Sequence, residues 1–245
     1  MKHKILFVVA HPDDESLWIG GTLSFLAKRK EVDVYVLCAT GKHDEERSKE
    51  FENALKIAGV TKWFLADENI PKQGGIFLSD LDSTISNGLK SLNLIPEDID
   101  LLITHPFYGD EHKHAQHSQL FIAMNSFCRT LKIPFGFFSS MTIPYFMLNP
   151  LATDMRRYKN THVVNYCSCS GAWRDIEPKF FFQFKINHTI KNKMLKCYKS
   201  INQKEHQAGY ASWDNSVEGF YFMEKNVFHD IYQNMDIPGG EGLFT

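Results

Sequence analysis

The sequence has no excess of charge of either sign and no long uninterrupted apolar segment. Its 245 residues include 27 lysines and arginines against 29 aspartates and glutamates, which gives a formal net charge of -2. Such a balance offers no electrostatic reason to bind nucleic acid or an anionic membrane, so we expect neither as a partner. No segment approaches the roughly 18 apolar residues of a membrane-spanning helix. The apolar run at 5–10 is too short for a signal peptide, and we therefore expect a cytoplasmic protein.

Cysteine is scarce, and the glycine-rich loops of nucleotide-binding proteins are missing. Five cysteines are an odd number in a chain of this length, which does not indicate a disulfide framework. No Gly-x-Gly-x-x-Gly or Gly-x-x-x-x-Gly-Lys segment follows an apolar run. Their absence argues against a nucleotide-binding module.

Apolar runs alternate with helical patterns over the first two thirds of the chain. Runs rich in β-branched residues predict buried strands, and apolar residues at three- and four-residue spacing predict the helices between them. We predict strands at 5–10, 32–39, 62–66 and 99–104, and helices at 18–30, 45–58, 79–92 and 114–131. This alternation is typical of the α/β class, with a mostly parallel central sheet covered on both faces. We expect one domain over residues 1–245.

From residue 134 the chain changes character, because aromatic residues crowd among prolines and short alternating runs. We predict strands at 135–139, 161–167 and 179–184, a lysine-rich helix at 187–203 and an irregular tail after it. These strands would form a small aromatic-rich β section. Its aromatic side chains would pack as core or form a wall against a sugar. The same surface could equally join two copies of the chain as an oligomer.

The segment His11-Pro12-Asp13-Asp14 stands where the first predicted strand ends and a loop leads into a helix. In open α/β sheets, ligands bind beyond the carboxyl ends of the strands. An imidazole and a carboxylate three residues apart can both reach one metal ion, and zinc accepts nitrogen and oxygen ligands together. His11 and Asp14 are therefore candidate metal ligands, and a third ligand must come from elsewhere.

Three histidines, His112, His114 and His117, follow a later predicted strand. Near the start of a helix, His114 and His117 are three residues apart and therefore share one face. The carboxyl ends of parallel strands lie at one edge of a sheet, so this cluster can converge with the first on one point. A lone histidine is more often a core or surface residue, but the two clusters together predict a metal site.

These residues resemble the signature of the PIG-L or LmbE-like family, also called the N-acetylglucosaminyl deacetylase family. Residues 10–15 are similar to its Ala-His-Pro-Asp-Asp-Glu motif, and residues 114–117 are similar to its His-x-x-His motif. Further similarities lie at 18–22, 40–41, 47, 50 and 198–200. The resemblance implies an LmbE-like, Rossmann-like three-layer sandwich. It also implies a zinc-dependent hydrolase that removes an N-acetyl group from a glucosamine-like sugar.

The resemblance assigns roles to the matching residues. His11, Asp14 and His117 would be the metal ligands, with zinc as the cofactor, although another divalent ion would also suit this donor set. Asp13 would be the general base. It would take a proton from a water molecule whose pKa the metal lowers toward about 7.

Two further residues receive roles with open alternatives. His114 would stabilise the oxyanion or give a proton to the leaving amine, or it would only orient a neighbouring group. Arg47 would bind the substrate, but an ion pair with Glu50, three residues further on, is an equal alternative.

Two places depart from the family pattern. The family has Pro-Asp where this chain has Ala115-Gln116, so an acidic partner for the site is missing there. Its role would pass to Asp110 or Glu111, or be dispensable. The family often has an acidic residue after the second strand, where this chain has 42–44, Lys-His-Asp. This difference bears on the substrate contacts more than on the metal ligands.

Two alternatives to sugar deacetylation remain open. A metal-dependent amidase could use the same groups on a non-sugar amide or a thiol conjugate. A non-catalytic sugar-binding module could use the same sheet without turnover. The presence of all three candidate ligands and the candidate base argues against the binding module.

Overall fold

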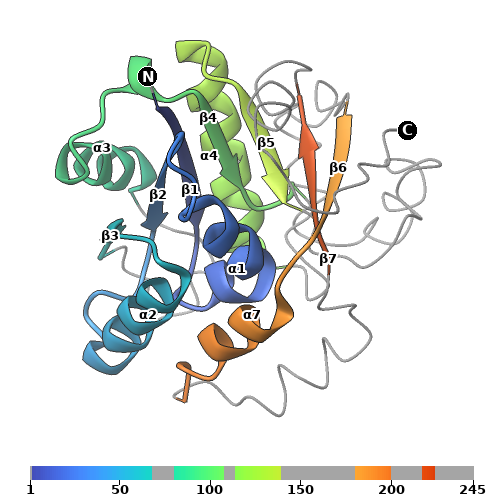
Figure 1. Ribbon diagram of the computed structural model, residues 1–245. Coiled ribbons are helices and arrows are strands. Elements are labelled where there is room, and N and C mark those ends of the chain that lie inside the picture. The colour runs from blue at the N-terminus through green and yellow to red at the C-terminus, as the bar shows by residue number, and fades with distance from the viewer. Residues whose placement is uncertain (1, 68–79, 108–113, 139–179, 200–216, 224–245) are drawn as a thin grey trace, which may run out of the picture.

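The described residues form a seven-stranded sheet (Figure 1). The computed structural model describes residues 2–67, 80–107, 114–138, 180–199 and 217–223, and of 180–185 and 217 only the backbone. The strands are β1 (His3–Val9), β2 (Val32–Cys38), β3 (Lys62–Leu65), β4 (Leu101–Thr104), β5 (Phe135–Phe138), β6 (Phe180–Lys185) and β7 (Val217–Phe222). Their order across the sheet is β3-β2-β1-β4-β5-β7-β6.

The direction in which successive strands are added to the sheet reverses between β1 and β4. Strands β1 to β5 pair in parallel, and β7 pairs antiparallel with both β5 and β6. From β1 the chain builds outward through β2 and β3, then returns to place β4 and β5 on the other side of β1. In such sheets the helices leave two adjacent strands in opposite directions, which opens a binding crevice at their carboxyl ends.

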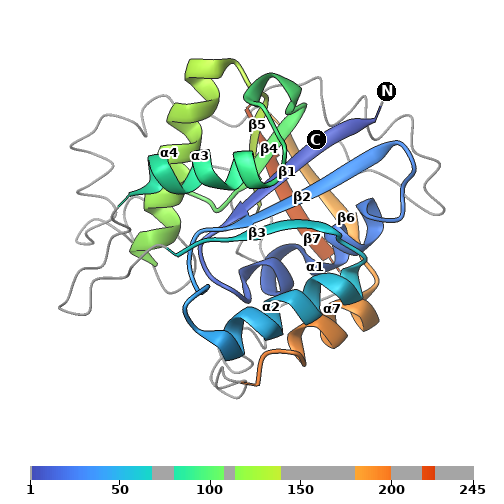
Figure 2. The same cartoon turned by 90° about the vertical axis from the view of Figure 1, so that its left-hand side faces the viewer.

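Helices cover both faces of the sheet, which confirms the three-layer α/β prediction. The helices are α1 (Asp14–Leu26), α2 (Glu45–Ala58), α3 (Leu81–Ser91), α4 (Ala115–Leu131), α7 (His188–Leu195) and a short 3-10 helix, η1 (Pro96–Asp98). Figure 2 shows α1, α2 and α7 on one face and α3 and α4 on the other.

Strand β1 packs into both cores, because successive side chains of a strand point to opposite faces. Ile5 and Phe7 belong to the core beneath α1, α2 and α7, whereas Leu6 and Val8 belong to the core beneath α3 and α4. All four side chains are at most 1% exposed. A central strand that is buried on both faces has a continuous run of apolar residues. This run allowed the strand to be predicted from the sequence.

Most predicted elements are found, with shifted ends. Helix α2 has the predicted bounds, because Asp44 caps its start and Gly59 ends it in a left-handed conformation. Helix α1 begins at Asp14, four residues before the predicted start. The predicted strand at 161–167 lies outside the described residues, as does 200–203 of the helix predicted at 187–203.

The sequence prediction was wrong about the tail, because residues 217–222 form strand β7 in the middle of the aromatic section. The aromatic strands belong to the main sheet, since β7 and β6 extend it beyond β5. Glu218 of β7 is buried, and its carboxylate accepts backbone N–H groups of α1 from Gly21 at 3.0 Å and Thr22 at 2.8 Å. Lys191 of α7 is buried beside it, 3.0 Å away. These contacts fix α1 against the late part of the chain.

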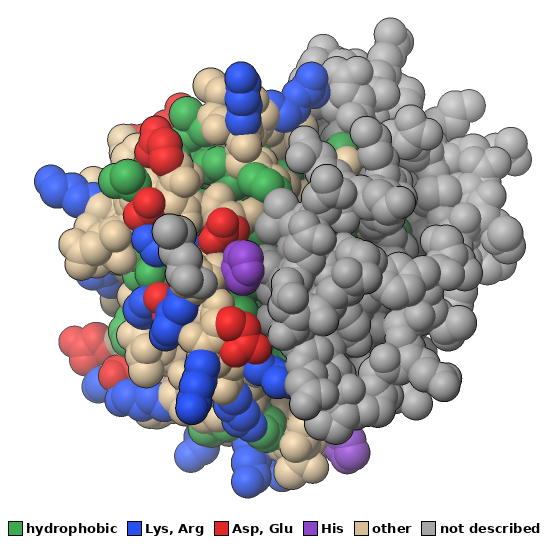
Figure 3. Space-filling view, turned by 45° about the horizontal axis from the view of Figure 1, so that its top comes forward, with side chains coloured by type: hydrophobic (Ala, Val, Ile, Leu, Met, Phe, Trp, Pro, Cys, Tyr) green, Lys and Arg blue, Asp and Glu red, His purple; other side chains and the backbone are tan. Residues whose placement is uncertain are grey.

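The described surface carries charges of both signs. On the face shown in Figure 3, basic side chains are interspersed with acidic ones over the described residues. Within the described ranges, no helix is both long and apolar enough to cross a membrane.

Candidate functional site

The loop that follows β1 presents residues 11–14 at the carboxyl edge of the sheet. A residue that follows β2 holds the start of this loop, because the Thr40 hydroxyl donates to the Ala10 carbonyl at 2.8 Å. Gly41 has a φ of 103°, and a Cβ at this position would collide with the ring of Pro12. Glycine is therefore required at 41 on two grounds, the backbone conformation and the space that Pro12 occupies. The Thr-Gly pair thus shapes the loop between His11 and Asp14.

Three imidazoles surround one oxygen of the Asp14 carboxylate. Oδ2 lies 3.3 Å from Nδ1 of His11, 3.3 Å from Nε2 of His105 and 3.4 Å from Nε2 of His117. The other oxygen, Oδ1, accepts the indole N–H of Trp18 at 3.3 Å. Burial alone would raise the pKa of Asp14, but the neighbouring imidazoles, His117 foremost, hold that pKa well below its usual range. Asp14 is therefore a carboxylate, the form that binds metal.

His11, Asp14 and His117 bring three donor atoms together in the spacing of a zinc site. Nδ1 of His11 and Nε2 of His117 are 3.1 Å apart, and each lies 3.3–3.4 Å from Oδ2 of Asp14. Nitrogen and oxygen ligands bind tetrahedral zinc at about 2.0–2.2 Å, which places neighbouring ligand atoms roughly 3.3–3.6 Å apart. The three residues predicted as ligands therefore fit around one ion.

His105 joins this cluster, although the sequence analysis did not single it out. It is fully buried, and Nε2 accepts the backbone N–H of Ala10 at 3.0 Å. Burial lowers the pKa of His105 to about 3, so the ring is neutral and Nε2 carries the lone pair that this hydrogen bond uses. His105 lines the site behind Asp14, where its hydrogen bond from Ala10 competes with metal binding through Nε2, although Asp14, His105 and His117 also lie close enough to hold an ion. Its position directly after β4, at the carboxyl end of a strand, could have identified His105 as a residue of the site.

Gln116 contacts His11 from the position where the family's paired-histidine motif has an acidic residue. Its amide Oε1 lies 2.5 Å from Nε2 of His11, so Nε2 donates to it. This contact leaves the lone pair of the His11 ring on Nδ1, the atom that faces Asp14 and His117. No acidic residue stands at this position, as the sequence indicates, but the neutral amide oxygen of Gln116 accepts the same N–H that a carboxylate could accept. Asp110 and Glu111 lie outside the described residues.

Replacing Gln116 with alanine should weaken metal binding by about ten- to a hundredfold, the usual cost of removing a group that orients a ligand. The free His11 ring could then adopt either tautomer. Competition with a chromogenic chelator would measure the affinity. Gln119→Ala, the same change one turn further along α4, is the control and should bind like the wild type. Equal affinities for Gln116→Ala and the control would contradict the assigned contact.

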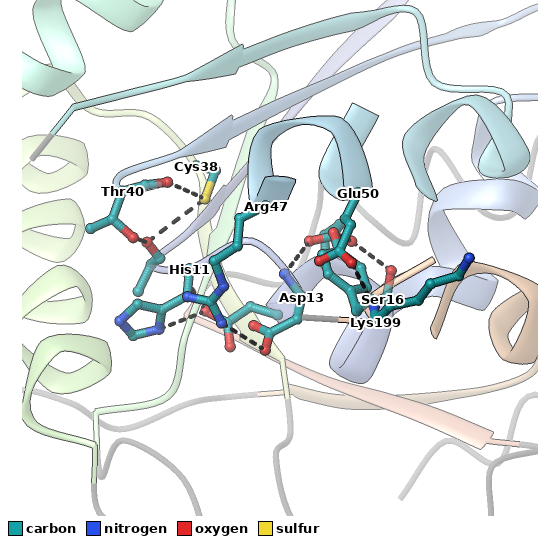
Figure 4. A network of polar contacts seen from close by, with 12 residues as sticks. His11, Asp13, Ser16, Cys38, Thr40, Arg47, Glu50 and Lys199 are labelled. Carbon is teal, nitrogen blue, oxygen red and sulfur yellow. Dashed lines mark hydrogen bonds and ion pairs between the residues drawn. The ribbon is translucent and has the colours of Figure 1, made fainter. Parts of the chain in front are cut away.

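Asp13 and Arg47 lie beside the candidate metal ligands (Figure 4). Nη2 of Arg47 is 3.9 Å from Oδ2 of Asp13, a contact that joins α2 to the loop after β1. Asp13 is only 7% exposed. Burial raises the pKa of its carboxyl well above the usual range, the charges of Asp14 and Glu15 raise it further, and Arg47 opposes them. A carboxylate with a raised pKa holds a proton more readily, as a general base near neutral pH should.

Glu50, the alternative ion-pair partner predicted for Arg47, makes a hydrogen bond to a different residue. Glu50 is buried, and one of its carboxylate oxygens accepts the backbone N–H of Lys199 at 2.6 Å. Asp44, in the unusual segment 42–44, accepts the backbone N–H groups of Glu46 and Arg47. Asp44 thus begins the helix that carries Arg47.

His114 lies at the rim of the cluster and caps the start of α4. Its side chain is exposed, with its ring centroid 4.8 Å from that of His11 and 4.6 Å from that of His117. One of its nitrogens lies within 4.8 Å of donor atoms of both neighbours. His114 therefore borders the same space from the solvent side. His112 lies outside the described residues.

Sequence comparisons find relatives that are named as deacetylases. The family model for PIG-L, described as GlcNAc-PI de-N-acetylase, matches residues 6–127, a range that contains all the residues of the cluster. The chain is 30% identical over 150 residues to the uncharacterized deacetylase YaiS of Escherichia coli K12, covering 58% of this chain and 77% of that one. It is 39% identical over 66 residues to a probable N-acetylglucosaminyl-phosphatidylinositol de-N-acetylase of Schizosaccharomyces pombe, covering 27% and 26%.

Solved structures share the fold at low sequence identity. A zinc-inhibited form of the teicoplanin deacetylase Orf2 matches with a TM-score of 0.50 at 15% identity, covering 89% of this chain and 97% of that one. GalB, the 4-carboxy-2-hydroxymuconate hydratase of Pseudomonas putida KT2440, matches with a TM-score of 0.53 at 15% identity, covering 93% and 98%. The two neighbours carry out different reactions, so the fold by itself does not identify the chemistry.

Proposed function

Because this chain belongs to the PIG-L family of deacetylases, we propose that it is a zinc-dependent hydrolase that removes an N-acetyl group from a glucosamine-like sugar or sugar conjugate. The observation that carries this proposal is the triangle of donor atoms from His11, Asp14 and His117, with sides of 3.1, 3.3 and 3.4 Å. Three protein ligands leave a position open for water and substrate, the arrangement of catalytic rather than structural zinc.

The donor set suits the proposed ion. One carboxylate and two imidazoles are ligands that zinc accepts. Hydrogen bonds with Gln116 and Trp18 orient two of them, His11 and Asp14 respectively. When bound, zinc would polarise the amide carbonyl and lower the pKa of a water molecule toward about 7. Manganese, iron or cobalt would also suit this set, and their supply in the cell would decide among them.

Two neighbouring residues would move protons and stabilise charge. Asp13 would take the proton from the water molecule that attacks the amide carbon, because it is a buried carboxylate next to the ligand Asp14. His114 would stabilise the negative charge that develops on the carbonyl oxygen, or give a proton to the leaving amine. Its exposed position at the rim suits contact with a substrate that enters from solvent.

Arg47 would bind the substrate, since its guanidinium group lies beside Asp13 and is 31% exposed. Arg47→Ala should raise KM by about tenfold and change kcat by less than about threefold, because a group that binds ground state and transition state alike affects KM alone. Steady-state kinetics would measure both constants. Arg29→Ala, which removes an arginine that stacks on Phe25, is the control. A fall in kcat at constant KM would instead mean that Arg47 acts on Asp13.

The substrate class is the part of the proposal that depends on the relatives. Both curated relatives are named as deacetylases, and one is named for an N-acetylglucosaminyl lipid. A metal-dependent amidase acting on a non-sugar amide or a thiol conjugate would use the same residues. We further propose that residues 1–245 form one domain, since β1 and β7, from opposite ends of the chain, share one sheet.

A substrate screen tests the proposed function. Free N-acetylated sugars, nucleotide sugars, lipid-linked sugars and oligosaccharides would be incubated with the zinc-loaded protein, and acetate and a new primary amine would be measured in equal amounts. Treatment with a chelator should stop release, and zinc should restore it. Full activity in metal-free protein would refute the mechanism. Addition of water without release of acetate would favour a hydratase, and sugar binding without turnover would favour a binding module.

A further inference from the structure

The proposed base, Asp13, has a backbone conformation that a residue with a Cβ rarely adopts. Its φ is 128° and its ψ is -31°, at the position that begins α1. Crowding between the Cβ and the backbone disfavours positive φ in every residue except glycine. The backbone must therefore be held there by surrounding contacts. The carbonyl of Asp13 accepts the N–H groups of Ser16 and Leu17, the first bonds of the helix.

The backbone N–H of Asp13 is held by the side chain of Glu15. It donates to Oε2 of Glu15 at 3.0 Å, in a fully buried position. The other oxygen, Oε1, accepts the hydroxyls of Ser16 at 2.5 Å and Tyr198 at 2.6 Å. Glu15 therefore links the conformation of Asp13 to a residue that lies 183 positions later in the sequence.

Tyr198 is itself firmly placed. Its side chain is 2% exposed, and its backbone N–H donates to the carbonyl of Leu195, the last residue of α7. The next backbone N–H, that of Lys199, donates to Glu50 of α2 at 2.6 Å. Figure 4 shows Glu50 and Lys199 close to Ser16 and Asp13. Two helices thus anchor the hydroxyl that reaches Glu15.

We propose that Tyr198 and Glu15 are positioning residues, which hold Asp13 in its strained conformation and so aim its carboxylate at the reacting water. This inference rests on the proposed function, in which Asp13 is the base. The connection runs through the backbone of Asp13, so it should affect proton transfer and leave the metal ligands as they are. A side chain misplaced by about 1 Å can cost a hundredfold in rate.

Tyr198→Phe removes the hydroxyl and keeps the ring. We expect kcat to fall by about ten- to a hundredfold, while KM and the zinc affinity stay within about twofold. Tyr35→Phe is the control, because it removes a hydroxyl that lies 3.1 Å from Nζ of Lys62 in the core beneath α3 and α4, whereas Tyr198 belongs to the core on the opposite face. It should leave kcat unchanged. An unchanged kcat in Tyr198→Phe would overturn the proposal.

A double mutant distinguishes a role of Tyr198 in positioning Asp13 from a purely structural role. If Tyr198 acts through Asp13, adding Tyr198→Phe to Asp13→Asn should not lower the residual rate further, because the two changes then remove the same contribution. If the rate falls by the same factor in both backgrounds, Tyr198 has only a structural role and the proposal fails. Glu15→Gln should keep most of the activity that Glu15→Ala loses, since an amide oxygen can still accept the Asp13 N–H.

A crystal structure of the full-length Tyr198→Phe variant tests the geometry without any substrate. The bond from Asp13 to Glu15 should lengthen or break, and the carboxylate of Asp13 should be displaced. An unchanged Asp13 would overturn the inference even if the enzyme proves to be a deacetylase. If Asp13→Asn is as active as the wild type, the assignment of the base fails instead, and the structure still decides whether Tyr198 holds the loop.

Discussion

Replacing Asp13 with asparagine should lower kcat by about a hundred- to ten-thousandfold and leave the bound metal in place. Asparagine has nearly the same size and can occupy the same position, but its amide cannot accept the proton of the attacking water. The three proposed ligand atoms belong to His11, Asp14 and His117, so this change removes none of them. Elemental analysis would measure the metal, and release of acetate would measure the rate.

A matched change at the opposite edge of the sheet provides the control for Asp13→Asn. Asp98 pairs with Lys4 at 2.7 Å near the amino end of β1, so Asp98→Asn removes a surface charge far from the loop after that strand. It should turn over like the wild type, since exposed ion pairs contribute little. If Asp13→Asn keeps more than about a tenth of the wild-type rate, the base must be another residue.

Replacing His117 with alanine should abolish tight metal binding, and turnover should be lost as a consequence. His117 is 2% exposed, and its Nε2 completes the donor triangle with His11 and Asp14. Two remaining protein ligands are too few for a catalytic zinc site. We expect the affinity to fall by more than about a hundredfold, beyond the effect expected for Gln116→Ala, which removes only an orienting contact.

The His117 variant needs a test of folding beside the test of metal binding. His188→Ala removes an exposed histidine at the start of α7 and should keep full metal content. Circular dichroism of both variants would show whether the α/β fold persists. A folded His117→Ala protein that still binds one zinc per chain tightly would reject His117 as a ligand.

The sequence could predict the sheet and the meeting of the two histidine-containing motifs because their signals are local. A buried parallel strand is a continuous apolar run, as in residues 5–9, and a helix start with a capping residue is visible at Asp44. Parallel strands place their carboxyl ends at one edge, so two motifs about 100 residues apart could be expected to meet. His11 and His117 do lie 3.1 Å apart.

Contacts between distant residues escaped the prediction because no spacing rule relates them. From the sequence, Gln116 was compared only with the acidic residue that the family has at this position. An amide oxygen, however, also accepts the N–H of His11. His105 was not predicted as a residue of the site, because its partners Ala10 and Asp14 are about 90 positions away in the sequence. Strand β7 was missed because a buried charge, Glu218, interrupts its apolar pattern. Its partner Lys191 becomes visible only in three dimensions.

The bonds between Glu218 and helix α1 have a consequence for the order in which the protein folds. Gly21 and Thr22 emerge from the ribosome nearly 200 residues before the carboxylate that accepts their N–H groups. Until β7 is synthesised, α1 lacks this acceptor and β5 lacks its neighbour on one side. Contacts so far apart in sequence slow folding, because a long loop must close first. The nascent chain therefore carries the whole His-Asp cluster long before the scaffold that supports it is complete.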